Sequence, residues 1–490
     1  MKQLAFDFNN MFSFAIGKTH GVTDRDLSAM QALVKKSHAH LQEILADKQS
    51  RINLNLEWAH LPYQDTKLID NIQKLGNEIA KKYENVISLG IGGSYLGLKA
   101  AQDALCPAYY NEFPAERKGR PRVYFEGNNL DPQTLSVLLK NLDPRKTFAV
   151  VISKSGETTE TKAAFMVVEQ WLKKSVGRKY GRQIFAITDP KSGTLRKKVD
   201  SAQALDPLSF RSMPLLPGVG GRYSELNMGL LHLAIVGVDI NEVMAGARAM
   251  HKRCNNADMF KNPAYMYAVL QTIQYLKKAK PISILMPFSE QLKSTADWYC
   301  QLLAESTGKK YSRMIKKGID RKEEWLQDKG LIVNVGRTPV SSRGTNDLHS
   351  IQQNNIEGEN DKVVTFIRIQ NFKNDIAIPE SSDLLSGKSY SRLLSLAQEA
   401  TEWALVQQQR PNCAIIMPEI SAYTWGGLIF FFEMATAFEG ELLNINAFDQ
   451  PGVEGYKNYM YFKLGKPGLP SQVAQDIKKN PLIKRNRYII

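Results

Sequence analysis

The sequence predicts an α/β protein with two mainly parallel sheets, each sandwiched between helices. From about residue 83, short apolar runs are followed by turns rich in Gly, Ser and Thr and then by segments of helical length. Such alternation is typical of parallel sheets, because parallel neighbours need a crossover connection that is usually a helix. The pattern occurs before and after a helical stretch near residues 240–280, so this chain of 490 residues is expected to contain two sheets.

The strands follow from composition and from the turns that bound them. Runs rich in Val, Ile and Phe, each followed by a polar turn, predict two series of strands. The first series is expected at residues 86–89, 123–126, 148–153 and 184–188, and the second at residues 282–286, 331–335, 363–369 and 414–417. Ligands bind such sheets outside the carboxyl ends of the strands, which is where the polar turns fall.

Two further segments are expected to be helical. Residues 24–48 repeat apolar side chains such as Leu27 and Val34 at helical spacing, which predicts an arm that packs on a larger part of the chain. Residues 425–438 are strongly apolar, but Glu433 interrupts them and they fall short of the roughly 20 apolar residues that span a membrane. They are expected to form a buried helix, and no membrane partner is predicted.

The net charge is +15, from 64 basic and 49 acidic residues, and part of it gathers near the C-terminus. The basic residues there are Lys478, Lys479, Lys484, Arg485 and Arg487. They show no zinc-finger spacing, aromatic RNA-binding signature or heptad-bearing basic helix, so no nucleic-acid partner is predicted. A positive field that gathers small anionic substrates is a sufficient role, with plain solubility as the alternative.

Cysteine spacing and the N-terminal residues indicate a cytoplasmic protein. The four cysteines form neither a CxxC pair nor a dense disulfide framework; they are Cys106, Cys254, Cys300 and Cys413. The N-terminal residues carry an early acid and no sustained apolar run, unlike a signal peptide.

A glycine-rich loop follows the first expected strand. Gly90, Gly92, Gly93 and Ser94 precede an expected helix, so main-chain amides and the helix end can meet an anion there, although a tight structural turn is the alternative. Tyr95 stands where a dinucleotide-binding GxGxxG motif needs a third small residue. A P-loop ending at Gly17-Lys18-Thr19 fails too, because Phe12 replaces its first glycine. No nucleotide cofactor is predicted.

The segment from Ser153 to Glu160, with the sequence Ser-Lys-Ser-Gly-Glu-Thr-Thr-Glu, is interpreted as a phosphate site. It places four hydroxyls and an ammonium between a strand and a helix. Hydroxyl and amide donors can bind phosphate oxygens while Lys154 and the helix dipole offset the charge. The alternative is a helix start capped by Ser155 or Thr158.

Three further residues are candidates for proton transfer and charge stabilisation. Arg222 follows Gly220 and Gly221, which let a ligand approach the backbone, although a structural salt bridge would use the same residue. Glu305 lies near the end of an expected helix, where it could take and return a proton or simply pair with Lys309. His349 lies in a polar loop, and simple exposure is the alternative. No second His or Cys stands at metal-ligand spacing, so no metal is predicted.

In this order and spacing, the motifs resemble those of the glucose-6-phosphate isomerase family over about residues 84–460. The sharpest parts are Gly-Gly-Arg-Tyr-Ser at 220–224 and Phe-Asp-Gln-Pro-Gly-Val-Glu at 448–454, followed by Lys457. The resemblance implies two sugar-isomerase (SIS-type) α/β/α sandwich domains at residues 59–238 and 239–445. It also implies a helical N-terminal arm at 1–58 that packs on the second domain, and a C-terminal segment at 446–490 that carries the catalytic lysine and a basic tail.

The chemistry that the resemblance implies is the reversible isomerisation of glucose 6-phosphate and fructose 6-phosphate, in glycolysis and gluconeogenesis, with no cofactor. Glu305 would move a proton between C2 and C1 through a cis-enediol intermediate, and Arg222 would stabilise the developing negative charge. His349 and Lys457 would open the sugar ring. The substrate would be held by Gly92, Gly93, Ser94, Ser153, Lys154, Ser155, Thr158, Glu160 and Gln450. The histidine would come from a neighbouring subunit, which implies a homodimer with shared active sites.

Two acids depart from the family's pattern. Glu157 stands where a hydroxyl residue is common, and Glu225 directly follows the arginine motif. An acid at 157 that pointed inward would repel a phosphate dianion, so we predict that its side chain faces away from the site.

Three alternatives accompany this prediction. A bifunctional isomerase that also accepts mannose 6-phosphate would need a differently shaped pocket around the C2 hydroxyl. A non-catalytic sugar-phosphate sensor on the same SIS fold would keep the hydroxyl-rich loop but not the combination of Glu305, Arg222, His349 and Lys457. A nicotinamide-dependent dehydrogenase is disfavoured by Tyr95.

Overall fold

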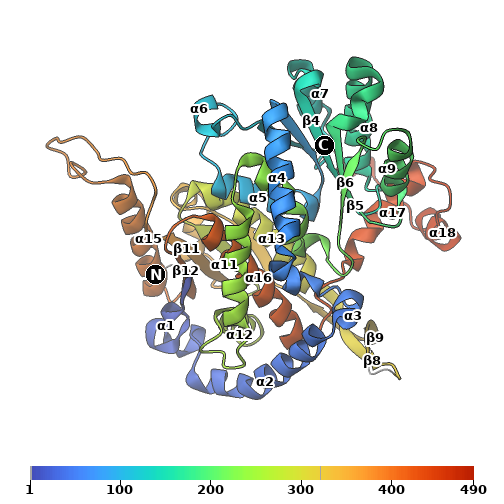
Figure 1. Cartoon of the computed structure of the whole chain (residues 1–490). Helices are drawn as coiled ribbons and strands as arrows, with labels where there is room; N and C mark the ends of the chain where they lie inside the picture. The colour runs from blue at the N-terminus through green and yellow to red at the C-terminus, as the bar shows by residue number, and fades with distance from the viewer. Residues whose placement is uncertain (1–2, 320–321) are drawn as a thin grey trace. The chain divides into compact units, whose positions relative to one another are not determined.

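The computed structural model describes residues 3–319 and 322–490 (Figure 1). The chain divides into two compact units, one ending at Ala447 and the other running from Phe448 to Ile490. The larger unit contains two five-stranded sheets, one of them wholly parallel and the other parallel except at one edge. This confirms the predicted α/β class and its two mainly parallel sheets. The domain boundaries at residues 58, 238 and 445 stay predictions.

The first sheet has the strand order β3-β2-β4-β5-β6, with every neighbouring pair parallel. Its strands are β2 (Asn85–Leu89), β3 (Arg122–Glu126), β4 (Thr147–Ile152), β5 (Ile184–Thr188) and β6 (Arg211–Pro214). The first four confirm the predicted strands to within one or two residues, whereas β6 was not predicted. All residues of β2, β4 and β5 are buried, as is typical of parallel strands covered on both faces.

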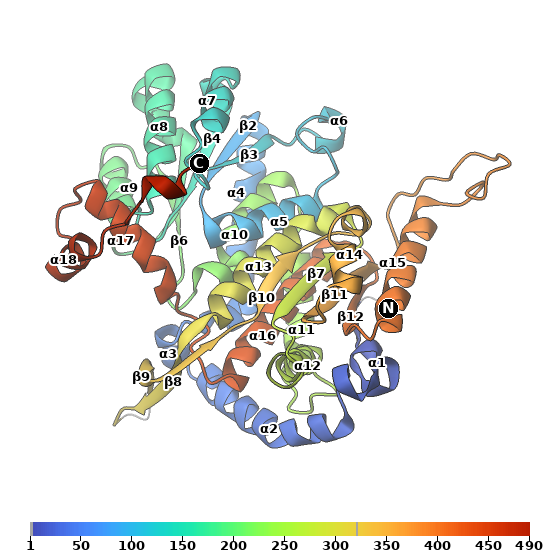
Figure 2. The same ribbon diagram turned by 180° about the vertical axis from the view of Figure 1, so that it is seen from behind.

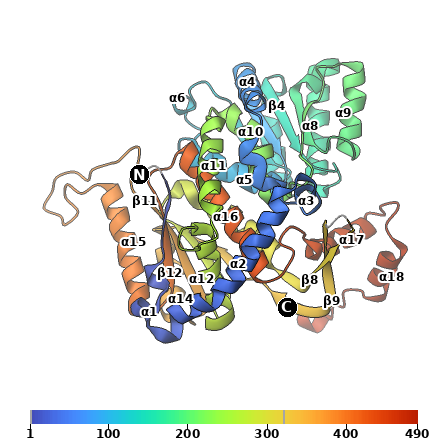
Figure 3. The same ribbon diagram turned by 60° about the horizontal axis from the view of Figure 1, so that its bottom comes forward.

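Helices cover both faces of this sheet. α7, α8 and α9 pack on one face, where Val168 and Val199 share a core with Ile87 and Val151, while α4 and α10 lie on the other (Figure 3). The bounds of the helices in this part of the chain are α4 (Thr66–Lys82), α5 (Leu96–Leu105), α6 (Pro114–Arg117), α7 (Pro132–Asn141), α8 (Thr159–Val176), α9 (Thr194–Leu205) and α10 (Glu225–Val236).

The second sheet has the order β1-β12-β11-β7-β10, and only β1 at its edge is antiparallel. Its strands are β1 (Ala5–Asp7), β7 (Ile282–Pro287), β10 (Thr338–Ser341), β11 (Lys362–Ile369) and β12 (Asn412–Met417). α15 covers one face, where Leu405 and Leu394 pack on Ile284 and Phe366, and α13 and α16 lie on the other face (Figure 2).

One predicted strand was wrong in its partner. Residues 331–335 were expected in the second parallel sheet, but they form the end of β9 (Glu323–Val335), which pairs antiparallel with β8 (Lys309–Lys317). The place beside β7 is taken by β10, which lies only a few residues further along the chain. An apolar run specifies a strand and not its neighbour, so the sequence pattern could not distinguish these two partners.

The most apolar segment forms the predicted buried helix. α16 (Ala422–Leu442) is buried from Thr424 to Leu442, including its acids. None of the helices in the described part of the chain combines the length and the apolar character needed to cross a membrane.

The remaining helices lie in three regions of the sequence: the N-terminal residues, the second sheet and the C-terminal unit. They are α1 (Ser13–His20), α2 (Asp24–Ala46), α3 (Lys48–Asn53), α11 (Ile240–Cys254), α12 (Pro263–Lys278), α13 (Lys293–Thr307), α14 (Gln352–Glu357), α15 (Tyr390–Gln407), α17 (Glu454–Lys463) and α18 (Ser471–Lys479). α2 confirms the predicted helix at residues 24–48, and it packs against α12 and α16.

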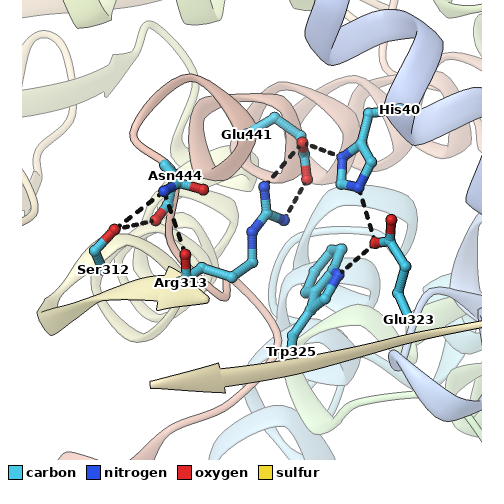
Figure 4. A network of polar contacts seen from close by, with 7 residues as sticks. All are labelled: His40, Ser312, Arg313, Glu323, Trp325, Glu441 and Asn444. Atoms are coloured by element: carbon cyan, nitrogen blue, oxygen red, sulfur yellow. Dashed lines mark hydrogen bonds and ion pairs between the residues drawn. The ribbon is translucent and has the colours of Figure 1, made fainter. Parts of the chain in front are cut away.

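A polar network attaches the β8–β9 hairpin to α2 and α16 (Figure 4). His40 on α2 lies 2.7 Å from Glu441 on α16 and 2.9 Å from Glu323 on β9. Arg313 on β8 donates twice to Glu441, and its guanidinium lies 4.1 Å from the centre of the Trp325 ring. The hairpin that begins directly after α13 is therefore held by charged groups from two other elements.

Candidate active site

Arg222 is the best-anchored charged residue among the sequence candidates. It lies in a short 3-10 helix, η6 (Gly221–Tyr223), and only 2% of it is exposed. Its Nε donates to Ser306 Oγ at 2.7 Å, its Nη1 to Glu305 Oε2 at 3.1 Å and its Nη2 to the Ala447 carbonyl at 2.6 Å. These acceptors hold the planar guanidinium in one orientation against Glu305.

Glu305 lies in the last turn of α13, at the helix end that the sequence predicts. Its second carboxylate oxygen accepts from Gln301 Nε2 at 3.0 Å, while 29% of the side chain stays exposed. Lys309, which the sequence offered as an ion-pair partner of Glu305, donates to the main-chain carbonyl of Glu305 at 2.6 Å. The carboxylate is therefore held on both oxygens and still open to a small molecule.

The glycine-rich loop packs directly against this pair of residues. Gly92, Gly93 and Ser94 form a short 3-10 helix, η3. A Cβ on Gly93 would lie 1.9 Å from the Gly221 carbonyl oxygen, so only glycine permits this approach of η3 to η6. Gly92 faces Gln301, whose Nε2 would lie 2.9 Å from a Cβ at position 92. The structure thus brings the glycine loop, Arg222 and Glu305 together.

The loop from Ser153 to Thr158 connects β4 to α8 and is shaped by its own hydroxyls. Ser153 Oγ accepts from the Gly156 amide at 3.0 Å, and Ser155 Oγ accepts from the Glu157 amide at 3.1 Å. Thr158 is the N-cap residue of α8, but its side chain makes no capping hydrogen bond. The alternative of a side-chain-capped helix start is therefore not realised, and the first amides of α8 present donors to an anion.

The two loops share one edge of the first sheet. β2 and β4 are adjacent and parallel, with Leu89 opposite Val151, so the segments that follow them leave from the same carboxyl edge. Lys154 and Ser155 are exposed at this edge, and Glu160 in the first turn of α8 is half-buried. Hydroxyls, amides and a lysine there match the donor set that binds phosphate.

Glu157 carries the charge that is least compatible with a phosphate site. Its carboxylate lies 3.1 Å from Nζ of Lys162, which is in the first turn of α8. The ion pair offsets the negative charge next to the loop. The outward orientation of Glu157 stays a prediction.

His349 takes no part in the hydrogen bonds of this cluster. It ends a short 3-10 helix (Asn346–His349) and is exposed, and its ring makes no hydrogen bond to any residue that the structure describes. Leu348, its neighbour, packs on the core of the second sheet and anchors the segment. The histidine is thus presented outward from a fixed base.

Gln450 and Lys457 belong to the C-terminal unit. Gln450 precedes a short 3-10 helix (Pro451–Val453), and Lys457 lies in α17, where its Nζ donates to Glu454 at 2.9 Å. Burial alone would lower the pKa of Lys457, but the hydrogen bond and charge of Glu454 outweigh it and raise this pKa above its usual value. Lys457 is therefore a cation at neutral pH.

Two residues of the candidate site were missed by the sequence analysis. Gln301 orients Glu305, and Ser306 accepts from Arg222 while its hydroxyl lies 3.1 Å from that of Tyr223. Gln301 stands four residues before Glu305 on one helix, a spacing that brings side chains together and could have identified it. No spacing in the sequence could have identified Ser306.

Among residues 3–319 and 322–490, no three His, Cys, Asp or Glu side chains are grouped so as to hold a metal ion.

Comparison with known proteins gives a consistent result. The family model described as phosphoglucose isomerase matches residues 66–464. Glucose-6-phosphate isomerase of Carboxydothermus hydrogenoformans is 38% identical over 487 residues, which cover 98% of each chain. A crystal structure of a hypothetical protein from Thermus thermophilus is 30% identical, with a TM-score of 0.77 over 94% of this chain and 100% of that one. A glucose-6-phosphate isomerase from Chlamydia trachomatis has the same fold, with a TM-score of 0.76 at 22% identity over 98% and 91% of the two chains.

Proposed function

Because this chain belongs to the phosphoglucose isomerase family, we propose that the cluster around Glu305 and Arg222 is the catalytic centre of a glucose-6-phosphate isomerase. The enzyme interconverts glucose 6-phosphate and fructose 6-phosphate. The observation that carries this proposal is the hydrogen bond from the buried Arg222 guanidinium to the partly exposed Glu305 carboxylate, next to a glycine loop and a hydroxyl-rich loop.

Glu305 is the base in this mechanism. It removes the proton from C2 of the open-chain aldose and returns it to C1, while the C1 carbonyl oxygen gains a proton and the C2 hydroxyl loses one. The intermediate is a cis-enediol, and both directions use the same atoms. The hydrogen bonds from Gln301 and Arg222 fix the carboxylate, which favours transfer between two adjacent carbons.

Arg222 supplies the electrostatic partner of this step. Negative charge develops on the sugar oxygens as the proton leaves carbon, and a fixed guanidinium stabilises that charge without reorganising. Ser306 and the Ala447 carbonyl, which hold Arg222, support this role.

The phosphate is held by the loop at the carboxyl edge of the first sheet. Ser153, Lys154, Ser155 and Thr158 donate to its oxygens, and Ser94, Gly92 and Gly93 complete the site from the neighbouring loop. The uncapped start of α8 adds main-chain donors and a favourable dipole. Glu160 and Gln450 orient sugar hydroxyls.

Ring opening precedes the proton transfer and involves a second subunit. His349 and Lys457 transfer protons at the ring oxygen and the anomeric hydroxyl. The exposure of His349 supports the proposal that it enters the active site of a neighbouring copy, in a homodimer with shared active sites. We also place the enzyme in the cytoplasm, where its four free cysteines would stay reduced.

The test is a coupled assay of the purified protein with fructose 6-phosphate, in the presence of a chelator and without added nucleotide. Formation of glucose 6-phosphate supports the proposal. If the protein binds sugar phosphates but shows no turnover, the proposal fails and a sugar-phosphate sensor on the same fold takes its place.

A further inference from the structure

Two buried acids lie beside the proposed catalytic centre and have no part in the mechanism above. Glu225 is the first residue of α10, three positions after Arg222, and Glu433 lies in the middle of α16. Each is only 2% exposed. Burying a carboxyl group is costly unless it is neutral or well paired, so this arrangement calls for a physical explanation.

Glu225 is surrounded by three other helices. Its Oε1 accepts from the indole Nε1 of Trp298 on α13 at 2.7 Å. On α5, a Cβ at Gly97 would lie 2.4 Å from Glu225 Cγ, so glycine makes room for this acid. The carboxyl of Glu433 on α16 is its hydrogen-bonded neighbour. The site is built around a carboxyl group rather than merely tolerating one.

The contacts of these two acids fit a proton shared between them. Glu225 Oε2 is buried and accepts from no N–H or hydroxyl donor among the described residues. A protonated Glu433 supplies the missing donor, whereas two ionised carboxylates side by side in this interior would repel strongly. Burial raises the pKa of Glu225 to about 7, and burial together with the Glu225 charge raises the pKa of Glu433 well above its usual range.

This pair provides a second attachment of the helix that carries the catalytic base. Arg222 and Tyr223 hold the end of α13 through Glu305 and Ser306. Glu225 holds the same helix at Trp298, seven residues earlier, which is about two turns or 10 Å along the axis. One short segment of chain therefore holds α13 at two points on one face.

We propose that Glu225, through the proton it shares with Glu433, is a positioning residue that holds α13 where Glu305 meets Arg222. The role rests on the proposed isomerase function. Glu225 does not touch the substrate. It acts through Trp298, and a shift of about 1 Å in the base would cost roughly a hundredfold in rate.

The charged surroundings make this role dependent on pH. Tyr223 faces the pair from η6 and is kept neutral, because burial raises its pKa well above the usual range. Trp298 from α13 and Gly97 from α5 do not titrate, and Lys99 and Asp103 on α5 pair with each other. Loss of the shared proton as pH rises leaves two buried negative charges side by side, so Glu225 is pushed away from its indole partner.

Two variants at one position test the role. Glu225→Gln keeps an acceptor for Trp298 and removes one ionisable group, so near neutral pH its kcat should stay within about twofold of wild type and its alkaline fall in kcat should move up by about one pH unit or more. Glu225→Leu removes the acceptor, so kcat should fall about 10- to 100-fold at every pH while KM changes by less than about threefold. His232→Leu is the matched control, because His232 is a buried polar residue on the same helix, bonded to Gln102 at 2.9 Å.

A spectroscopic measurement keeps the inference independent of turnover. The indole N–H signal of Trp298, assigned with Trp298→Phe, should shift with pH in the substrate-free wild type and stay constant over the same range in Glu225→Gln. A signal that titrates identically in both proteins, or a pH profile of kcat that Glu225→Gln leaves unchanged, overturns the inference even if Glu225→Leu does not fold. A wild type that is inactive but shows the indole titration would instead refute the isomerase function.

Discussion

At the scale of single residues, the site depends on side chains that hold one another. Glu305 was predicted from its place at a helix end, but its orientation comes from Arg222, which is 83 residues away in sequence, and from Gln301. A sequence pattern shows the type of a residue and its local element. It does not show which distant donor reaches a carboxylate oxygen.

Glu305→Gln should abolish isomerisation and leave sugar-phosphate binding largely intact, since the amide keeps the shape but cannot take a proton. We expect a loss of about 10²- to 10⁴-fold or more in kcat, measured in the coupled assay, with binding followed by calorimetry. Glu290→Gln is the control, because Glu290 lies just before α13 and its side chain is 75% exposed. Lost binding with residual turnover would contradict the role of Glu305.

Arg222→Lys should lower kcat by about 10²- to 10³-fold, because a lysine cannot hold three acceptors in one plane. The same change leaves buried acceptors unsatisfied and should destabilise the fold by about 1–3 kcal/mol for each one. Arg337→Lys is the matched control, since Arg337 is equally buried and paired with Glu439. The thermal unfolding temperature should fall in both variants, and only Arg222→Lys should lose kcat in the folded protein.

At the scale of elements, strands were more predictable than their partners. Seven of the eight expected strands lie in the sheet assigned to them, whereas residues 331–335 belong to the β8–β9 hairpin. That hairpin is held by the network of His40, Arg313, Glu323 and Glu441. Charged groups from four elements, α2, β8, β9 and α16, meet there, and no local sequence pattern predicts such a contact.

The attachment of the hairpin should weaken as pH rises. Burial alone would lower the pKa of His40, but the hydrogen bonds and charges of Glu441 and Glu323 outweigh it and raise this pKa above 6.5. The stabilisation is therefore fully present below the unfolded value of about 6.5 and is lost as pH rises through the higher folded value. Hydrogen exchange of β8 and β9 amides, corrected for intrinsic rates, should accelerate above that pH.

Variants on α2 separate this effect from general loosening. His40→Gln should exchange faster at low pH and lose the pH dependence. His38 lies on α2, like His40, but is bonded to Tyr265 on α12. In His38→Gln, hydrogen exchange of the hairpin should therefore be the same as in wild type. Equal pH dependence in His40→Gln and wild type would show that His40 is not the titrating group.

At the scale of the whole molecule, one chain supplies Arg222 and Glu305 together but presents His349 outward. In the proposed enzyme, the histidine of a second copy would complete the site. The homodimer is therefore a functional requirement of the proposal rather than an addition to it.

Mixed dimers test this requirement. His349→Ala and Glu305→Gln should each be nearly inactive, but dimers that contain one chain of each have one intact site, made of wild-type Glu305 and His349 from different chains. Random pairing of equal amounts should restore about a quarter of wild-type activity. Activity that stays at the level of the single variants after subunit exchange would show that His349 acts within its own chain.

The sequence by itself determined the α/β class, the two mainly parallel sheets, the buried apolar helix and the family. These follow from local periodicity, from turn residues and from short motifs, which survive without knowledge of the tertiary structure. The tertiary structure decided the partner of residues 331–335, the hydrogen bonds from Arg222 to Glu305 and Ser306, and the burial of Glu225 beside Glu433. These depend on contacts between residues far apart in sequence, because burial and hydrogen-bond partners are properties of the packed chain and not of any segment of it.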